Sequence, residues 1–410
     1  MENIRLKNIK NFVALDIRFG AKLTCLIGDN GTGKTTILQS LTAALVANIE
    51  NIPNDDSLIR IQKTGKDREE WAYIYVKCFG HQQGLVENDI LMSTLPPLYK
   101  TDFGFGTNTT TPFAQENGLL DQLFIAFSQQ TQKKDRRRDN RSKIRQPNID
   151  DVSSFLEGEP DTRFDDVLDW LAAAMDTNTS LDERDATLPV IQKVLDVIGE
   201  ITNTPMRLVV ETNARSEVKV EFTATGQRMP LRFLSQGFNN VIGWVGFFMK
   251  RLWEAWESCK TLKSKHFFEH PALCLIDEID TYLHPKWQRT ILNVLIQHFP
   301  NTQWVVTTHS PLVIGNLDYP NNEDVLIYNI NLDGTATMLS NAFGKDNNHL
   351  NYAYFGVPFR NEKMQKNLDD LFEMIENEET EAANLLLEQL ETQLGSDDAD
   401  IVRAHILLNF

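Results

Sequence analysis

The feature that most constrains this chain is a glycine loop near the N-terminus, set between an apolar strand and a helix. The loop reads Gly28-Asp29-Asn30-Gly31-Thr32-Gly33-Lys34-Thr35 and matches the pattern G-x-x-x-x-G-K-[S/T] without a mismatch. The apolar run Lys22–Ile27 precedes it, and the helical pattern of residues 36–44 follows it. This context favours a phosphate-binding loop over a glycine-rich turn that merely caps a helix. The sequence therefore predicts an α/β protein that binds a nucleoside triphosphate.

Each part of the loop has a chemical role toward phosphate. Backbone N–H groups of the loop and of the helix N-terminus can surround the β- and γ-phosphates. Lys34 supplies a positive charge to the same oxygens, and Thr35 supplies a hydroxyl ligand for Mg²⁺. The predicted nucleotide-binding residues here are Asn30, Gly31, Thr32, Gly33, Lys34, Thr35 and Thr36.

A second apolar strand, Ala272–Ile276, ends in the adjacent carboxylates Asp277 and Glu278. One carboxylate at such a strand end can hold Mg²⁺ opposite Thr35, and the other can polarise the attacking water. We assign Asp277 to the metal and Glu278 to the water. The alternative is two acids that merely end a strand.

Two further segments could also contact a phosphate group. His309 comes after the strand Gln303–Thr307 and could hydrogen-bond the γ-phosphate, although a loop histidine with ordinary partners is the alternative. Ser235 and Gly237 begin a helix predicted over Gln236–Ser258, whose N-terminus is another anion site. One subunit does not need two such helix ends for one nucleotide. The second is therefore expected to reach the γ-phosphate of a partner across a two-fold axis.

In this order the loop, Leu234-Ser235-Gln236-Gly237, Leu275-Ile276-Asp277-Glu278, Asp280 and His309 resemble the ATPase heads of the ABC/SMC–RecF–Rad50 superfamily. The runs Leu275–Pro285 and Thr307–Pro311 are similar to its compact OLD-like branch. The C-terminal stretch is similar to the tails of antiphage ATPases such as the Septu PtuA type.

The resemblance implies ATP and Mg²⁺ as cofactors and Asp280 as a further residue of the nucleotide site. It also implies a homodimer, or a higher homo-oligomer, that holds two ATP molecules between facing subunits. The signature reads Ser-Gln-Gly-Phe where transporter-type proteins have Ser-Gly-Gly-Gln, so we expect an ATPase with slow hydrolysis.

Two features of the family's pattern are open or absent. A glutamine between the loop and the signature is not fixed by the sequence, and Gln129 and Gln130 are the candidates. There is no long heptad repeat, and Pro147, Pro160 and Pro189 are expected to break the middle segment. The long coiled coil of Rad50 or SMC proteins is therefore expected to be missing.

We expect no nuclease on this chain. About a hundred residues follow His309, and after Asn341 they look helical rather than alternating in strands and helices as a Toprim nuclease would. The Asp398-Ala399-Asp400 run lies in a solvated acidic stretch, which disfavours a metal site. An effector nuclease, if the system has one, is expected on a separate subunit.

The charge pattern limits contacts with nucleic acid. The chain holds 40 Lys and Arg against 57 Asp and Glu, a net charge of −17, so any such contact has to come from a local basic patch. The segment Lys133–Arg145 is basic, and it could contact a phosphate backbone, form a solvated loop or dock on an acidic partner. The acidic tail Leu368–Leu394 has apolar residues at helical spacing, which suit either packing on the head or an interface.

The remaining composition favours a cytoplasmic protein without membrane contact. The four cysteines are scattered and form no C-x-x-C pair, which is typical of reduced thiols. No signal peptide opens the chain, and its longest uncharged apolar run, Val241–Met249, is about half the ~20 residues of a membrane span.

Taken together, these patterns predict an α/β, ABC-type P-loop ATPase head with an inserted helical region and a helical C-terminal appendage. Residues 1–90 would form the half with the loop, and 91–205 the inserted region with the basic segment. Residues 206–340 would form the half with the signature, the carboxylates and His309, and 341–410 the acidic appendage.

The expected function is a nucleotide-gated sensor or regulatory subunit of a prokaryotic antiphage complex that controls a separate effector nuclease. The alternative is a RecF-like DNA-repair ATPase that clamps duplex DNA. A third candidate, the ATPase of an ABC transporter, is disfavoured by the signature and by the long insertion.

Overall fold

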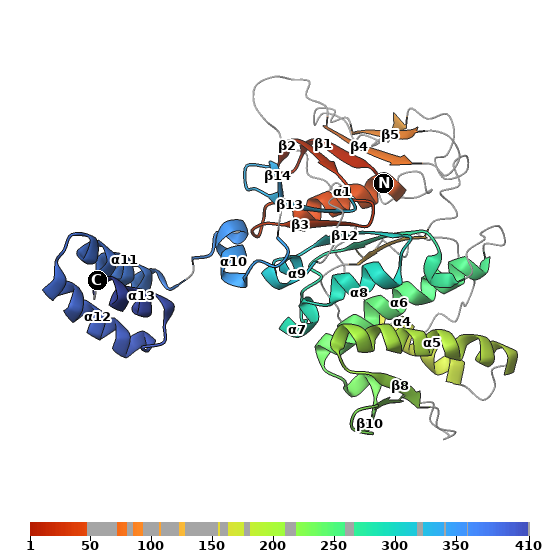
Figure 1. Cartoon of the computed structure of the whole chain (residues 1–410). Coiled ribbons are helices and arrows are strands. Elements are labelled where there is room, and N and C mark those ends of the chain that lie inside the picture. Colours follow the sequence, from red (N-terminus) through yellow and green to blue (C-terminus); the bar gives the residue numbers. More distant parts are fainter. Residues whose placement is uncertain are drawn as a thin grey trace, which may run out of the picture. The chain divides into compact units, whose positions relative to one another are not determined.

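A computed structural model provides the structure of the protein. It describes residues 1–46, 72–79, 85–92, 106–107, 123–127, 155, 163–175, 181–209, 219–258, 266–317, 323–339, 342–358 and 360–408. The chain divides into two compact units, Met1–Lys345 and Asp346–Phe410 (Figure 1). The four-part division of the chain given above stays a prediction.

A six-stranded sheet in the first unit carries the glycine loop. Its strands, in spatial order, are β14 (Ala336–Leu339), β13 (Val325–Ile330), β3 (Leu23–Ile27), β12 (Thr302–Thr307), β11 (Ala272–Ile276) and β7 (Leu123–Phe127). All neighbouring pairs are parallel except β13 with β14. Every residue of β3 is buried, as its uninterrupted apolar sequence predicts for a strand covered on both faces. Because β3, β11 and β12 run parallel, the segments that follow them meet at one edge of the sheet.

A second, antiparallel sheet has the order β2-β1-β4-β5-β6. Its strands are β1 (Asn3–Ile9), β2 (Phe12–Arg18), β4 (Ala72–Phe79), β5 (Leu85–Met92) and β6 (Gly106–Thr107). The edge strand β6 is short and pairs with the end of β5. There Leu91 pairs with Gly106 and Ile90 with Thr107.

Helices cover both faces of the central sheet. Helix α1 (Lys34–Val46) lies between the two sheets, and α6 (Gln236–Ser258) and α8 (Ile291–His298) cover the opposite face (Figure 1). Three fully buried rings join these layers: the Phe248 centroid lies 5.1 Å from that of Phe299 and 5.0 Å from that of Trp304. This aromatic contact fixes α6 and α8 on β12.

The inserted helical region contains α4 (Arg163–Met175) and α5 (Leu181–Thr202). Pro189 lies inside α5, so the prediction that it breaks this segment is wrong. The adjacent Val190 and Ile191 are buried, and such packing offsets the lost backbone hydrogen bond. A three-stranded sheet follows, with β8 (Met206–Val209), β9 (Lys219–Phe222) and β10 (Arg228–Pro230) in the order β10-β9-β8.

The helical segment from Pro285 to His298 is interrupted and forms two helices, α7 (Pro285–Gln288) and α8. Between them the Thr290 hydroxyl donates to the carbonyls of Ile201 (2.8 Å) and Trp287 (3.1 Å). A threonine that bonds to nearby backbone competes with helical hydrogen bonding, which accounts for the interruption.

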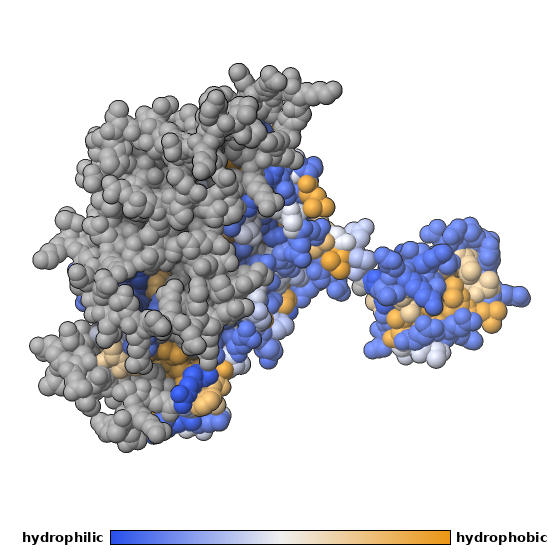
Figure 2. All heavy atoms as spheres, turned by 180° about the vertical axis from the view of Figure 1, so that it is seen from behind, coloured by the Kyte–Doolittle hydropathy of each residue, from blue (hydrophilic) through white to orange (hydrophobic). Residues whose placement is uncertain are grey.

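The second unit is helical, with α10 (Asn347–Phe355), α11 (Glu362–Glu376), α12 (Thr380–Leu394) and α13 (Ala399–Leu408). Its last three helices enclose their own core, made of Leu368, Leu371, Ala383, Leu387, Leu390, Ile401 and Ala404. The apolar spacing of the tail therefore serves packing inside this bundle. Apolar side chains also show on its surface (Figure 2), and those exposed on α12 and α13 are Leu385, Val402, Ile406 and Leu407.

Among the described residues, no helix combines the length and the apolar character that crossing a membrane requires.

Candidate nucleotide site

The loop between β3 and α1 adopts a conformation that needs glycine. Gly28, Gly31 and Gly33 all have positive φ angles, of 137°, 80° and 101°. A Cβ on Gly28 would lie 2.4 Å from the Ile330 carbonyl oxygen, and one on Gly33 would lie 2.6 Å from the Phe12 ring. The glycines are therefore needed both for the positive φ angles of the loop and for its close packing against Ile330 and Phe12.

The turn between β1 and β2 supports the loop from one side. Asn11 Nδ2 donates to the Gly31 carbonyl at 2.7 Å, and the ring of Phe12, the next residue, contacts Gly33. Sequence reasoning missed both residues, because nothing in the β1–β2 pattern shows which loop the turn will contact.

Lys34 is buried inside the loop. Its Nζ donates to the carbonyls of Gly28 (2.9 Å) and Asp29 (2.8 Å). Burial lowers the pKa of the Lys34 ammonium, while the charges of Asp277 and Glu278 act in the opposite direction. A buried ammonium held only by carbonyl oxygens can bind a phosphate oxygen more strongly than it binds them.

The two predicted magnesium ligands are in direct contact. Thr35 Oγ1 donates to Asp277 Oδ2 at 2.9 Å, and Thr307 Oγ1 donates to the other oxygen, Oδ1, at 2.6 Å. Burial raises the pKa of Asp277, against the two hydrogen bonds from Thr307 and Thr35. A hydroxyl and a carboxylate beside a phosphate loop are the hard oxygen donors that Mg²⁺ takes alongside nucleotide phosphates, so these residues fit the metal.

Glu278, the predicted water-activating residue, has an unusual backbone. Its φ of 50° is in the left-handed region, which costs a non-glycine residue roughly 1–3 kcal/mol. Two contacts hold it there: its N–H donates to Thr307 Oγ1 at 2.7 Å, and its Oε2 accepts from Thr281 Oγ1 at 3.1 Å. Burial raises the pKa of the Glu278 carboxyl, against the Thr281 hydrogen bond. A half-buried carboxylate with a raised pKa is suited to proton transfer near neutral pH.

Asp280 contacts the histidine loop of the same chain. Its Oδ1 accepts from Thr308 Oγ1 at 2.5 Å and from the backbone N–H of His309 at 3.2 Å. Together with Thr307, these bonds connect the segment after β11 to the segment after β12. Thr307 and Thr281 are further residues that sequence reasoning missed, although two threonines directly before His309 were a usable signal.

The signature segment lies beside this network. Ser235 is exposed just before α6, whereas Gly237 is buried. A Cβ on Gly237 would lie 2.7 Å from the Tyr282 carbonyl oxygen and 3.0 Å from the Trp287 ring. Packing within its own chain therefore explains why residue 237 is a glycine, since the missing side chain lets α6 approach the turn that follows Asp280.

Two predicted features lie outside the described residues. These are the candidate glutamines Gln129 and Gln130 and the basic segment Lys133–Arg145. Strand β7 ends just before the two glutamines, and its Phe127 carbonyl accepts from the Asp277 N–H at 3.1 Å.

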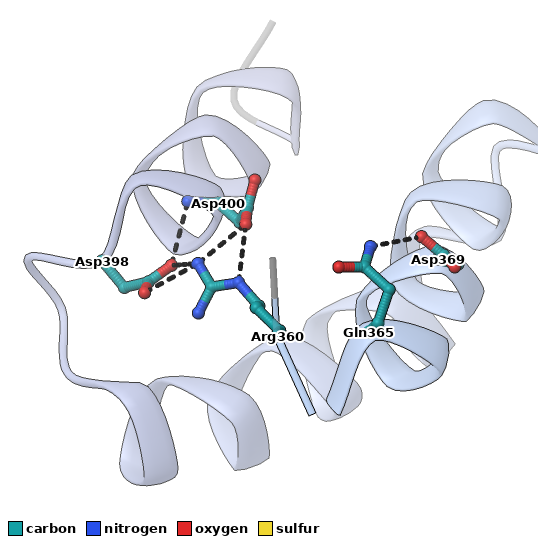
Figure 3. Close-up of polar contacts among 5 residues, drawn as sticks. All are labelled: Arg360, Gln365, Asp369, Asp398 and Asp400. Carbon is teal, nitrogen blue, oxygen red and sulfur yellow. Dashed lines mark hydrogen bonds and ion pairs between the residues drawn. The ribbon is translucent and has the colours of Figure 1, made fainter. Parts of the chain in front are cut away.

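The other acidic motif, Asp398 and Asp400, is occupied by a cation from its own unit (Figure 3). Arg360 donates to Asp398 at 2.7 Å and to Asp400 at 2.8 Å. Within the part of the chain that the structure describes, no cluster of three or more His, Cys, Asp or Glu side chains is placed to hold a metal ion.

A glycine loop at the end of β3, with a threonine bonded to the carboxylate that ends a parallel strand, defines a P-loop ATPase. Family models agree: residues 3–157 match an AAA domain, and residues 258–315 match an AAA domain described as a putative AbiEii toxin of a type IV toxin–antitoxin system.

Among its relatives, the chain is 25% identical to the Retron Vc95 probable ATPase of Vibrio cholerae serotype O1 biovar El Tor, over 84% of this chain and 77% of that protein. It is 22% identical to the Septu protein PtuA of Bacillus thuringiensis, over 77% of this chain and 72% of that protein. The SMC head domain from Thermotoga maritima matches 83% of this chain and 98% of its own, with 13% identity and a TM-score of 0.47. The chain thus has the site of a P-loop ATPase and is similar, over most of its length, to a retron ATPase and to Septu PtuA.

Proposed function

We propose that this chain hydrolyses ATP slowly and acts as the nucleotide-gated sensor subunit of a prokaryotic antiphage defence complex, in which it controls a separate effector nuclease. The main support for ATP binding and hydrolysis is the contact of Thr35 with Asp277. It brings the phosphate loop and the acidic strand end together across 242 residues of sequence. Homology with a retron ATPase and with Septu PtuA over more than three quarters of the chain supports the defence role.

In this proposal the loop holds the triphosphate. Backbone N–H groups of the loop and of α1, with Lys34, bind the phosphate oxygens. Thr35 and Asp277 hold Mg²⁺, which neutralises charge on the β- and γ-phosphates when it is bound. Asn30, Thr32 and Thr36 complete the loop's contacts.

Glu278 orients the attacking water and accepts its proton, because its strained backbone and the Thr281 bond direct its carboxylate. The attack on the γ-phosphate breaks its bond to the β-phosphate, leaving ADP and phosphate. His309, with its backbone fixed by Asp280, contacts the γ-phosphate and responds when that group leaves.

Two copies of the chain are proposed to close around two ATP molecules. The exposed Ser235 and the N-terminus of the 23-residue helix α6 would face the γ-phosphate held by Lys34 of the partner. Closure with ATP, and opening after hydrolysis, would be the signal that the effector nuclease receives. The assembly is proposed to act in the cytoplasm, with Lys133–Arg145 as its candidate contact for nucleic acid.

The test uses a tagged Glu278→Gln chain expressed in the native host, trapped with ATP and purified gently. Mass spectrometry would identify bound protein, and nuclease-sensitive staining would identify nucleic acid. A stoichiometric nuclease that is absent from a Lys34→Ala control supports the proposal. DNA alone, lost when Arg136–Arg138 are neutralised, would instead establish a RecF-like clamp.

A further inference from the structure

The turn of residues 280–283 touches two of the predicted phosphate contacts. On one side, Asp280 Oδ1 accepts the backbone N–H of His309. On the other, the Tyr282 carbonyl packs directly on Gly237, where a Cβ would approach it to 2.7 Å. The turn therefore lies between the histidine loop and the start of the signature helix of one chain.

The side chain of Gln288, at the end of α7, fastens this turn to the histidine loop. Its Nε2 donates to the carbonyls of Asp280 (3.3 Å) and Leu283 (3.0 Å). Its Oε1 accepts from Ser310 Oγ at 2.7 Å. Both ends of the amide are used at once, which a carboxylate or an aliphatic side chain cannot do at neutral pH.

Ser310 transmits this contact to the loop. It is buried, and its backbone N–H donates to Thr308 Oγ1 (3.0 Å). Its own Oγ accepts from the Leu312 N–H (3.1 Å) in the first turn of α9 (Pro311–Gly315). The residues on both sides of His309 are thus fixed, Thr308 by Asp280 and Ser310 by Gln288.

We propose that Gln288 is a positioning residue for ATP hydrolysis. It holds the 280–283 turn against the Thr308–Ser310 segment, so that His309 keeps its alignment with the γ-phosphate. Because the same turn contacts Gly237, Gln288 also ties the placement of His309 to that of the signature helix. Gln288 itself touches no phosphate, and the inference rests on the proposed function.

The test compares full-length wild type, Gln288→Leu and Gln288→Glu for ATP binding and for phosphate release at saturating Mg²⁺ and ATP. Gln288→Leu is expected to lower kcat about tenfold with KM and ATP affinity within about twofold, because alignment is lost and binding groups remain. Gln288→Glu is expected to be as slow at pH 8. Relative to wild type, its kcat should recover as pH falls, because a protonated carboxyl can donate to a carbonyl and still accept from Ser310.

Gln192→Leu is the matched control. Gln192 also bridges two backbone groups, donating to the Met206 carbonyl and accepting from the Leu208 N–H, both at 3.2 Å, but it joins α5 to β8. The Gln192→Leu variant should lower the melting temperature as Gln288→Leu does, but its kcat should stay within about twofold of wild type.

Wild-type kcat in Gln288→Leu, or a Gln288→Glu rate that does not recover with acidity, would overturn the inference and leave the proposed function standing. Equal losses of kcat in Gln192→Leu and Gln288→Leu would also overturn it, since both would then report lost folding. Absence of ATP hydrolysis by the wild type would refute the proposed function itself.

Discussion

Each of the two units contains a pair of acidic side chains close together in the sequence, but the two pairs differ in burial and in how the neighbouring cation is held. Asp277 and Glu278 end a buried strand, where burial raises the pKa of both carboxyls. Asp398 is also partly desolvated, but its hydrogen bond from Arg360 lowers its pKa overall. The first pair lies beside the ammonium of Lys34, which backbone carbonyls already hold, whereas the second pair shares one guanidinium.

This difference shows how a carboxylate pair acquires its role. A pair whose ionised form is destabilised by burial gains most from a cation that arrives with a ligand. A pair that already shares an arginine has little to gain from a metal and instead joins two parts of the fold. Arg360 precedes α11 and the two aspartates flank the start of α13, so this ion pair closes the helical bundle (Figure 3).

The largest expected contrast concerns the two cations. Lys34→Ala should weaken ATP binding at least about a hundredfold, because it removes the charge that binds the phosphates within a buried loop. Arg360→Ala should leave ATP affinity unchanged. Titration calorimetry with ATP and Mg²⁺ measures both, and normal affinity in Lys34→Ala would reject the loop as the nucleotide site.

The next contrast concerns magnesium. Asp277→Asn should raise the Mg²⁺ concentration needed for half-maximal ATP hydrolysis about 10- to 100-fold, since the loss of an oxygen anion weakens the metal site. Asp400→Asn should not change it. A titration of phosphate release with Mg²⁺ measures this concentration in both variants. An equal increase in the two variants would contradict the assignment of the metal to Asp277 alone.

A smaller effect is expected on stability. Arg360→Met should destabilise the second unit by about 1 kcal/mol, a modest value because the Asp400 side chain is 36% exposed and solvent screens the pair. Hydrogen exchange in α11 and α13 should accelerate, while exchange in β3 and β11 should not. The exposed Lys366→Met is the control, and an equal effect there would reduce the Arg360 contact to a minor surface pair.

The smallest expected effect is a dependence on pH. Because the pKa of Asp398 is lowered, this group stabilises the fold above its ordinary value of 3.8 and loses that contribution as pH falls through the lowered pKa. For Asp277, whose pKa is raised, the sign is opposite in the nucleotide-free protein: its contribution is present below 3.8 and is lost as pH rises through the raised pKa.

Hydrogen exchange of the nucleotide-free protein, followed from neutral pH to about pH 3, checks the sign for Asp398. The protection lost by α13 below about pH 4 should be smaller in Asp398→Asn than in wild type. Identical acid profiles in these two proteins would contradict the pKa assignment.

The parts of the site that could be predicted from the sequence are those in which chemistry and local structure share one short segment. The loop of residues 28–35 and the strand end at Asp277 each carry their own backbone signal, a glycine pattern or an apolar run. Parallel pairing then forces the segments after β3, β11 and β12 to one edge. The sequence could therefore predict their proximity without knowing the full fold.

The other parts of the site and of the fold depend on contacts between distant segments, and neither segment's sequence indicates which partner it will contact. Nothing in the sequence pairs Asn11 with Gly31, Gln288 with Ser310, or Arg360 with two aspartates about 40 residues away. The uninterrupted helix through Pro189 was missed for a related reason, because packing against neighbouring helices overrides local propensity.

The most direct test of the account is single-turnover phosphate release by wild type, Glu278→Gln and Asp398→Asn, with ATP and Mg²⁺. We expect wild type to release phosphate slowly and Asp398→Asn to match it. Glu278→Gln should bind ATP normally but release phosphate at least about a hundredfold more slowly. Undiminished release by Glu278→Gln would contradict the account, since the carboxylate that follows Asp277 would then have no part in hydrolysis.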